Sequence, residues 1–182
     1  ICSDLNKGMS VAILCRVNTD GLLPAMLLDK INRFSYSISS DGMTMSSYIG
    51  TTALAIVKLF TERCTPAVKR ALNCLSWDRY AIENLMSVCK SNKMSFWDID
   101  PKDLAYSCPS IAERLLTWRS YRKEKGDIEA LKYVLRDYRT KVFFKDSQFN
   151  LVMRSMISTI ESLLEYSGNE TVDEFLYDLE YM

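Results

Sequence analysis

The residues whose types and spacing most favour a chemical role are four cations on one short stretch: Arg119, Arg122, Lys123 and Lys125. Guanidinium and ammonium groups at such spacing bind carboxylates or phosphates through charge-assisted hydrogen bonds. The surrounding segment 114–145 holds ten Lys and Arg against four Asp and Glu, a local charge of +6. The segment 155–182 holds seven carboxylates and no Lys or Arg, a local charge of −7. Such asymmetry can serve docking between subunits or within one subunit.

Much of this charge has an ordinary structural explanation. A helical domain needs solvated faces, and exposed ion pairs contribute only about 0 to 1 kcal/mol each. Cations ahead of Gly126 also complement the C-terminus of a helix that ends there. We interpret most of the charges as solvated surface and the four-cation cluster as the interaction site, because stability does not require four cations at one helix end.

Two pairs of nearby carboxylates, Asp98 with Asp100 and Asp173 with Glu174, are the other residues that could take part in chemistry. Such pairs bind divalent cations or transfer protons. Neighbouring residues point to different faces of a helix, however, no third ligand is evident, and the chain contains no histidine. We therefore assign these pairs to capping and solvation, and we expect no enzyme activity, no metal and no cofactor.

Composition indicates a soluble, cytoplasmic protein with one or two domains. The 182 residues are 48% hydrophobic and 25% charged, and 23 basic residues balance 23 acidic ones. Six cysteines without a CxxC motif favour reduced thiols that pack as small apolar groups. The longest wholly apolar run, Ala53 to Val57, is far shorter than the roughly 20 residues of a membrane span, so no span is expected.

The elements that position these residues are predicted to be helices. In the first sixty residues, the run Val11 to Val17 is ambiguous between strand and helix, a helix begins near Pro24, and Ser35 to Ser47 forms a loop. The spacing of the apolar residues predicts a further helix from Ile49 to Phe60. Strand signals are scarce, which makes the class all-α.

From Thr65 onward, capping signals divide the chain into six helices up to Tyr166 and one more at the end. Thr65 and Ser76 are predicted N-caps, and Ser95 is predicted to open a short, irregular element near Pro101. The later predicted boundaries are a capping box at Ser110 and Glu113, a restart at Asp127 after Gly126, a long helix carrying Phe149 to Leu163, and a capping box at Thr171 and Glu174.

Residues 115–138 resemble the fourth and fifth helices of a death domain; their sequence is LLTWRSYRKEKGDIEALKYVLRDY. The shared pattern is an apolar pair, a tryptophan, a basic or polar turn, and then a helix that ends with an apolar residue followed by Arg. Trp77, Ala81 and Leu85 resemble the aromatic-led second helix of that family. SFWDID, residues 95–100, stands where the family has its short third helix. The resemblance covers 65–166 and implies an antiparallel six-helix bundle, 63–166, between a helical segment, 1–62, and an acidic helix, 167–182.

The resemblance implies a non-enzymatic adaptor that assembles with like domains into homo- or hetero-oligomers in apoptotic or other intracellular signalling. By position, the four cations would lie on the fourth-helix end and the following turn. Further interaction residues carried over by position are Arg136 and Asp137 near the fifth-to-sixth corner, and Asp98 and Asp100 on the third helix. The residues assigned to the core are Trp77, Trp118, Leu115, Leu131 and Leu135.

Two other functions remain open from the sequence. A helical nucleic-acid-binding protein, such as a viral one, would use the basic segment 114–145 on phosphates and would stack bases on Trp118, Tyr121, Tyr133 and Tyr138. A groove of the Bcl-2 type would receive a partner helix, and nine methionines with the apolar Ile49 to Phe60 helix are compatible with it.

Overall fold

A computed structural model describes residues 45, 47–75, 78–141 and 147–181 of the chain. Every regular element in these ranges is a helix, which confirms the predicted all-α class. The predictions for residues 1–44 and for Trp77 lie outside the described residues. The helices are α3 (Tyr48–Lys58), α4 (Pro66–Asn73), α5 (Arg79–Ser91), α6 (Pro101–Ser107), α7 (Pro109–Lys125), α8 (Asp127–Lys141), α9 (Ser147–Ser167) and α10 (Val172–Glu180).

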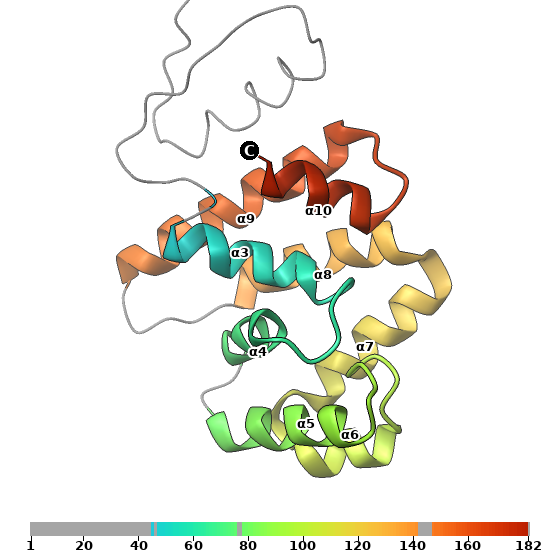
Figure 1. The fold of residues 1–182 in the computed structure, drawn as a ribbon. Coiled ribbons are helices and arrows are strands. Elements are labelled where there is room, and N and C mark those ends of the chain that lie inside the picture. The colour runs from blue at the N-terminus through green and yellow to red at the C-terminus, as the bar shows by residue number, and fades with distance from the viewer. Residues whose placement is uncertain (1–44, 46, 76–77, 142–146, 182) are drawn as a thin grey trace, which may run out of the picture.

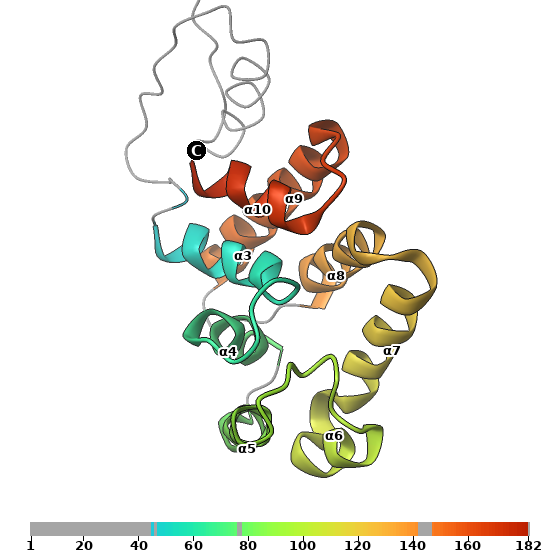
Figure 2. The same cartoon turned by 45° about the vertical axis from the view of Figure 1, so that its right-hand side comes forward.

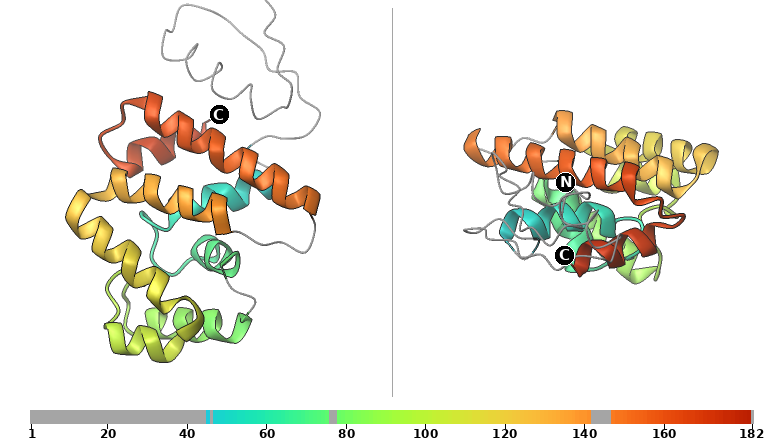
Figure 3. Two further views of the ribbon diagram at one scale, coloured as in Figure 1. Left: turned by 180° about the vertical axis from the view of Figure 1, so that it is seen from behind. Right: turned by 90° about the horizontal axis from the view of Figure 1, so that it is seen from above.

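The helices pack as a bundle with a distinct extension at one end. Helices α8 and α9 run side by side in opposite directions, and α3 packs against α4, α8, α9 and α10 (Figure 3). Helix α7 leads away from this group toward α5 and α6, which lie at the end of the molecule opposite α9 and α10 (Figures 1 and 2). The first half of α7 therefore lies far from the C-terminal helix.

Helix α3 is the central element of the bundle. It begins after Ser47, whose hydroxyl accepts a hydrogen bond from the Gly50 backbone N–H at 3.0 Å. All residues from Thr52 to Val57 are buried, so the helix is covered on nearly every side, as expected for one that is apolar all round. Because its apolar residues are covered by four other helices, the predicted Ile49 to Phe60 helix does not line an open groove in the described structure.

Three predicted boundaries are confirmed. Thr65 caps α4 by accepting from the Val68 N–H at 3.3 Å, with Pro66 in the first turn. Gly126, at a φ of 84°, separates α7 from α8 in a conformation that favours glycine. Thr171 and Glu174 form the predicted capping box, with hydrogen bonds of 3.2 and 3.3 Å.

Two predicted caps are wrong. Helix α5 begins at Arg79 and is capped by Asp78, not by Ser76, because the Asp78 carboxylate accepts from the Ala81 N–H at 3.0 Å. Helix α7 begins at Pro109, so its N-cap is Cys108, which makes no side-chain cap bond. Proline has no N–H to satisfy in a first turn, and the helix therefore starts ahead of the predicted Ser110 cap.

The third predicted element is displaced along the chain. Residues 95–100 form a turn and not a helix, and the short helix α6 follows from Pro101. Asp100 caps it by accepting from the Lys102 N–H at 2.8 Å. Pro101 thus occupies the first turn of α6, where proline is tolerated. With this shift, six described helices lie between Pro66 and Ser167, the number that was predicted.

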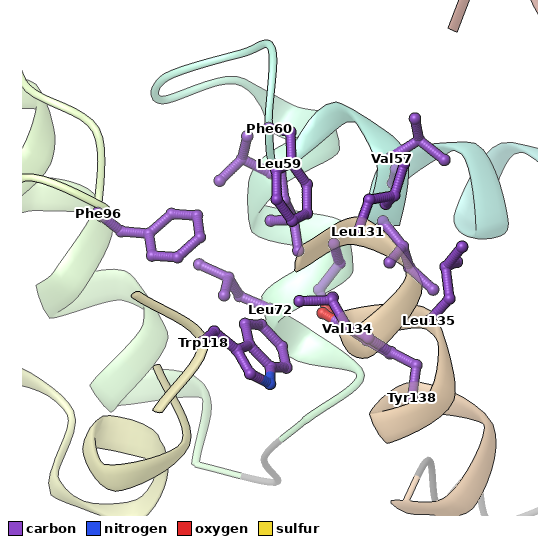
Figure 4. Packing of buried hydrophobic residues seen from close by; sticks show 14 of the residues in the cluster. Val57, Leu59, Phe60, Leu72, Phe96, Trp118, Leu131, Val134, Leu135 and Tyr138 are labelled. Carbon is purple, nitrogen blue, oxygen red and sulfur yellow. The ribbon is translucent and has the colours of Figure 1, made fainter. Parts of the chain in front are cut away.

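The core is organised around two aromatic side chains, Trp118 of α7 and Tyr138 of α8, whose ring centroids lie 5.6 Å apart (Figure 4). The Tyr138 hydroxyl donates to the Ala71 carbonyl at 2.9 Å, and burial raises its pKa well above the ordinary value. Leu115, Leu131 and Leu135 are fully buried, as predicted. Apolar residues of α3 and α10, the described helices before and after residues 63–166, belong to the same cluster as those of α7 and α8.

Candidate interaction groove

The second half of α7, the 95–100 turn and the start of α8 enclose a groove of about 550 Å³. Four of the eight predicted interaction residues meet there, although they are spread over 26 positions of the sequence from Asp98 to Lys123. The lining residues are Trp97, Asp98, Pro101, Leu116, Arg119, Ser120, Arg122, Lys123 and Asp127.

Arg122 forms part of the floor of this groove. Its guanidinium lies 4.8 Å from the Trp97 ring centroid and 5.4 Å from that of Phe60, which are cation–π distances. Two of its nitrogens also donate to the Asp127 carboxylate, at 2.7 and 2.8 Å. These hydrogen bonds lower the pKa of Asp127 below its ordinary value. Arg122 therefore ties α7 to α8 and to the 95–100 turn.

Arg119 is also held by the fold. Its guanidinium donates to the backbone carbonyl of Ile99, and its side chain is half-buried. This bond attaches the 95–100 turn to α7. A carbonyl oxygen satisfies a donor but does not neutralise a cation, and no carboxylate of the described residues forms an ion pair with Arg119.

Lys123 is the exposed cation of the groove. No described carboxylate forms an ion pair with it. Lys125 is exposed at the end of α7, pairs with Glu124 at 2.8 Å, and does not line the groove. The predicted four-cation cluster thus separates into two arginines that build the floor, one free lysine on the rim, and one lysine outside.

The predicted acidic residues of the turn also separate. Asp98 is exposed and lines the groove. Asp100 is exposed but is engaged as the α6 N-cap, and it does not line the groove. Both lie in the turn ahead of α6, so their predicted position on a short helix is wrong.

Asp137 and Arg136 lie outside the groove and bind other helices. The Asp137 side chain is only 8% exposed, accepts from the Trp118 indole N–H at 3.1 Å, and lies 3.3 Å from the Nε of Arg114. Arg136 is more exposed and pairs with Glu161 of α9 at 2.7 Å. Asp137 was expected on the surface, and it is interior because the buried indole N–H needs an acceptor.

Most of the predicted basic segment is neutralised within the structure. Six of its cations form ion pairs with nearby carboxylates, namely Arg114, Arg122, Lys125, Lys132, Arg136 and Arg139. Glu161 of α9 receives both Arg136 and Arg139, the second at 2.9 Å. Part of the acidic C-terminal segment is therefore the counter-charge of the basic one, and few of these cations are left to contact phosphates.

The aromatic residues proposed for base stacking are also engaged. Trp118 and Tyr138 are buried in the core. Tyr121 and Tyr133 stack on each other at 4.6 Å between α7 and α8. Trp118 and Tyr138 are therefore closed to a base, whereas Tyr121 and Tyr133 are half-buried and each covers one face of the other.

A second hollow of about 580 Å³ adjoins the first along the outer side of α6 and α7, and the two share Leu116 and Ser120. The remaining lining residues are Ala105, Pro109, Ala112, Glu113 and Thr117. We call the two hollows together the α7 groove. Its second half was missed from the sequence, where the only signal is a series of small residues on the exposed side of α7.

The cysteines have the properties of structural thiols. Cys64, Cys74, Cys89 and Cys108 are free, and burial raises the pKa of Cys74 and Cys89 to about 12 and that of Cys108 to about 11. A thiol with such a pKa is a poor nucleophile at neutral pH. In the described ranges, no three His, Cys, Asp or Glu side chains gather in a way that could hold a metal ion.

Comparisons with family models, with curated protein sequences and with solved structures give no significant match to this chain. Among the helices that the structure describes, none combines the length and the apolar character needed to cross a membrane.

Proposed function

We propose that this chain is a non-enzymatic protein–protein interaction module, an adaptor of intracellular signalling, which binds its partner in the α7 groove. The observation that carries the proposal is the composition of that groove. One half is lined mainly by small and apolar residues together with Glu113. In the other half, Asp98 and Lys123 are exposed beside Arg119 and Arg122, which the fold holds in place, and no described carboxylate pairs with Lys123. Preformed hollows of this kind accept anchoring side chains of a partner.

Rigidity of the floor supports binding over a merely structural role. Arg122 is held by two hydrogen bonds and two aromatic faces. Its side chain is therefore already ordered before a partner binds, and binding does not carry the entropy cost of immobilising it. The resemblance of residues 115–138 to a death domain adds support, because members of that family associate through the end of their fourth helix. Nucleic-acid binding is less favoured, since six cations of the basic segment are already paired with carboxylates.

The test is affinity capture with the purified chain as bait, followed by identification of the retained proteins by mass spectrometry. Ala105→Glu places a charge in the apolar half, and Lys123→Glu reverses the rim charge; both positions are exposed. Arg79→Glu, at the exposed start of α5 and outside the groove, is the matched control. We expect one identified partner to be retained by wild type and control and lost with both groove variants, with thermal melts unchanged.

Retention of the same proteins by all four baits would refute the proposal. So would retention that nuclease treatment abolishes, because the partner contact would then run through nucleic acid, whose binding weakens steeply with salt.

A further inference from the structure

Two cysteine thiols meet where the connection between α3 and α4 passes the end of α5. Cys64, in that connection, donates from its Sγ to the Met94 carbonyl at 3.2 Å. The Met94 N–H in turn donates to the carbonyl of Cys89, in the last turn of α5, at 3.0 Å. The Cys64 and Cys89 thiols also share a hydrogen bond. Two residues that are far apart in the sequence thus have their sulfur atoms side by side.

The two thiols differ in how far they are open to solvent. Cys89 is fully buried, whereas Cys64 is half-buried on a segment outside the helices. Burial and the adjacent Cys64 thiol raise the pKa of Cys89 to about 12, so the Cys89 thiol is rarely ionised at neutral pH. A small oxidant therefore reaches Cys64 first, while Cys89 is held next to it. An accessible thiol beside a second, resolving thiol is typical of a redox-sensitive pair.

We propose that Cys64 and Cys89 form a reversible disulfide and so act as a redox switch beside the α7 groove. The Cys64 thiolate attacks one sulfur of a low-molecular-weight disulfide such as oxidised glutathione, which forms a mixed disulfide and releases one thiolate. Cys89 then loses its proton, attacks the Cys64 sulfur and displaces the second thiolate. Two protein thiols are oxidised to one disulfide, the small disulfide is reduced to two thiols, and the two protons pass through solvent to the released thiolates. An excess of small thiol reverses both steps.

The segment that carries Cys64 supports one wall of the α7 groove. The Trp97 indole N–H donates to the Leu59 carbonyl, and the Phe60 and Trp97 rings lie 4.9 Å apart. Trp97 lines the groove, where the Arg122 guanidinium lies over its ring. The connection between α3 and α4 is therefore in contact with the same turn that shapes the groove.

Oxidation changes this support at one hydrogen bond. Disulfide formation consumes the Cys64 S–H, so the Met94 carbonyl, directly ahead of the 95–100 turn, loses its donor. A wall that is less firmly held must be ordered when a partner binds, and ordering lowers affinity. The oxidised chain should therefore bind its partner about three- to tenfold more weakly, the range expected for loss of one hydrogen bond. This consequence rests on the proposed function, whereas the disulfide itself does not.

Peptide mapping of the full chain tests the disulfide. The protein is incubated with oxidised glutathione at neutral pH, the remaining thiols are blocked, and the chain is digested with trypsin without reduction. Each of the six cysteines lies on a tryptic peptide of its own. We expect a glutathione adduct on peptide 64–69 as the first product, then a link between 64–69 and 80–90, and loss of this link when excess reduced glutathione is added.

Two variants separate the pairing from folding and from the other thiols. Cys64→Ser cannot form the disulfide but keeps a donor for the Met94 carbonyl, so its melt should stay close to that of reduced wild type and its partner binding should not respond to oxidant. Cys74→Ser is the matched control, because the Cys74 thiol, at the end of α4, donates to the Arg70 carbonyl at 3.3 Å. This control should form the same link as wild type.

Absence of the link at every concentration of oxidant overturns the inference, whether or not a partner is captured. A link from either peptide to another cysteine, such as Cys108, overturns the pairing. If the link forms but a groove-dependent partner is retained equally by the reduced and oxidised chains, the role as a switch is refuted. If no captured partner depends on the groove, the proposed function fails separately, and the peptide map still decides whether the disulfide forms.

Discussion

Replacement of Asp137 by alanine removes a carboxylate that binds both Trp118 and Arg114 inside the bundle. The Trp118 ring is 1% exposed, so its indole N–H has no access to water once the acceptor at 3.1 Å is gone. An unsatisfied buried donor costs about 1 to 3 kcal/mol. Alanine also has a higher helix propensity than aspartate, which offsets this loss of stability by roughly 0.5 kcal/mol.

The ion pair with Arg114 adds a smaller amount. Breaking a fully buried pair costs roughly 3 to 5 kcal/mol, but the Arg114 side chain is 23% exposed and can turn toward water. We therefore assign about 1 kcal/mol to this pair, and we expect Asp137→Ala to lower the free energy of unfolding by about 2 to 3 kcal/mol. In a chain of this length that loss corresponds to a fall in Tm of roughly 5 to 10 °C.

Urea unfolding followed by circular dichroism measures the effect, with Asp137→Asn as the control. The asparagine amide oxygen still accepts from the indole, so this variant should lose only about 1 kcal/mol. The combination of Asp137→Ala with Trp118→Phe should cost less than the sum of the single changes, because the second change removes the orphaned donor. Equal losses for alanine and asparagine, or a loss below about 0.5 kcal/mol for alanine, would refute the assigned role.

Three other predictions concern the groove and the thiols. Arg122→Ala should lower the free energy of unfolding by about 2 kcal/mol, through its aromatic contacts and the Asp127 pair, whereas Lys123→Ala should stay within about 0.5 kcal/mol in the same urea assay. Asp127→Asn should destabilise the chain by less than about 1 kcal/mol at neutral pH. Since the folded pKa of Asp127 is lowered, this difference should begin to shrink as pH falls below the ordinary value of 3.8 and should vanish below the folded pKa; a difference that persists in stronger acid would contradict the pairing. Cys74, Cys89 and Cys108 should react with a thiol reagent at pH 8 far more slowly in the folded chain than in urea. Their folded pKa values of about 11 to 12 exceed the ordinary 9.0, so the thiols of the unfolded chain ionise first. Their contribution to the free energy of unfolding should be constant below pH 9 and fall above it.

Sequence reasoning found those features that depend on neighbouring residues. Thr65 with Pro66, Gly126 with Asp127, and Thr171 with Glu174 each set a helix boundary through contacts within one turn, and all three were predicted. The failures at Ser110 and at Ser95 are also local. At both places a proline one or a few residues away set the helix start in competition with serine.

The roles of the charged residues could not be derived from the sequence, because they depend on contacts between distant positions. Arg119 binds Ile99 and Arg136 binds Glu161, residues 20 and 25 positions away. The role of the basic cluster as an interaction site stays a prediction, and its division into floor and rim depends on how the 95–100 turn packs on α7. The apolar half of the groove gave almost no sequence signal, since the small residues that form it are ordinary in any helix.

The burial of α3 has a consequence for how the protein is made. Among the described helices α3 leaves the ribosome first, and the helices that cover it include α8, α9 and α10, the last to be synthesised. At typical rates of translation, about ten seconds separate the synthesis of α3 from that of the helices that bury its apolar residues. During that interval the nascent chain exposes the stretch from Ala53 to Val57, a natural target for chaperones.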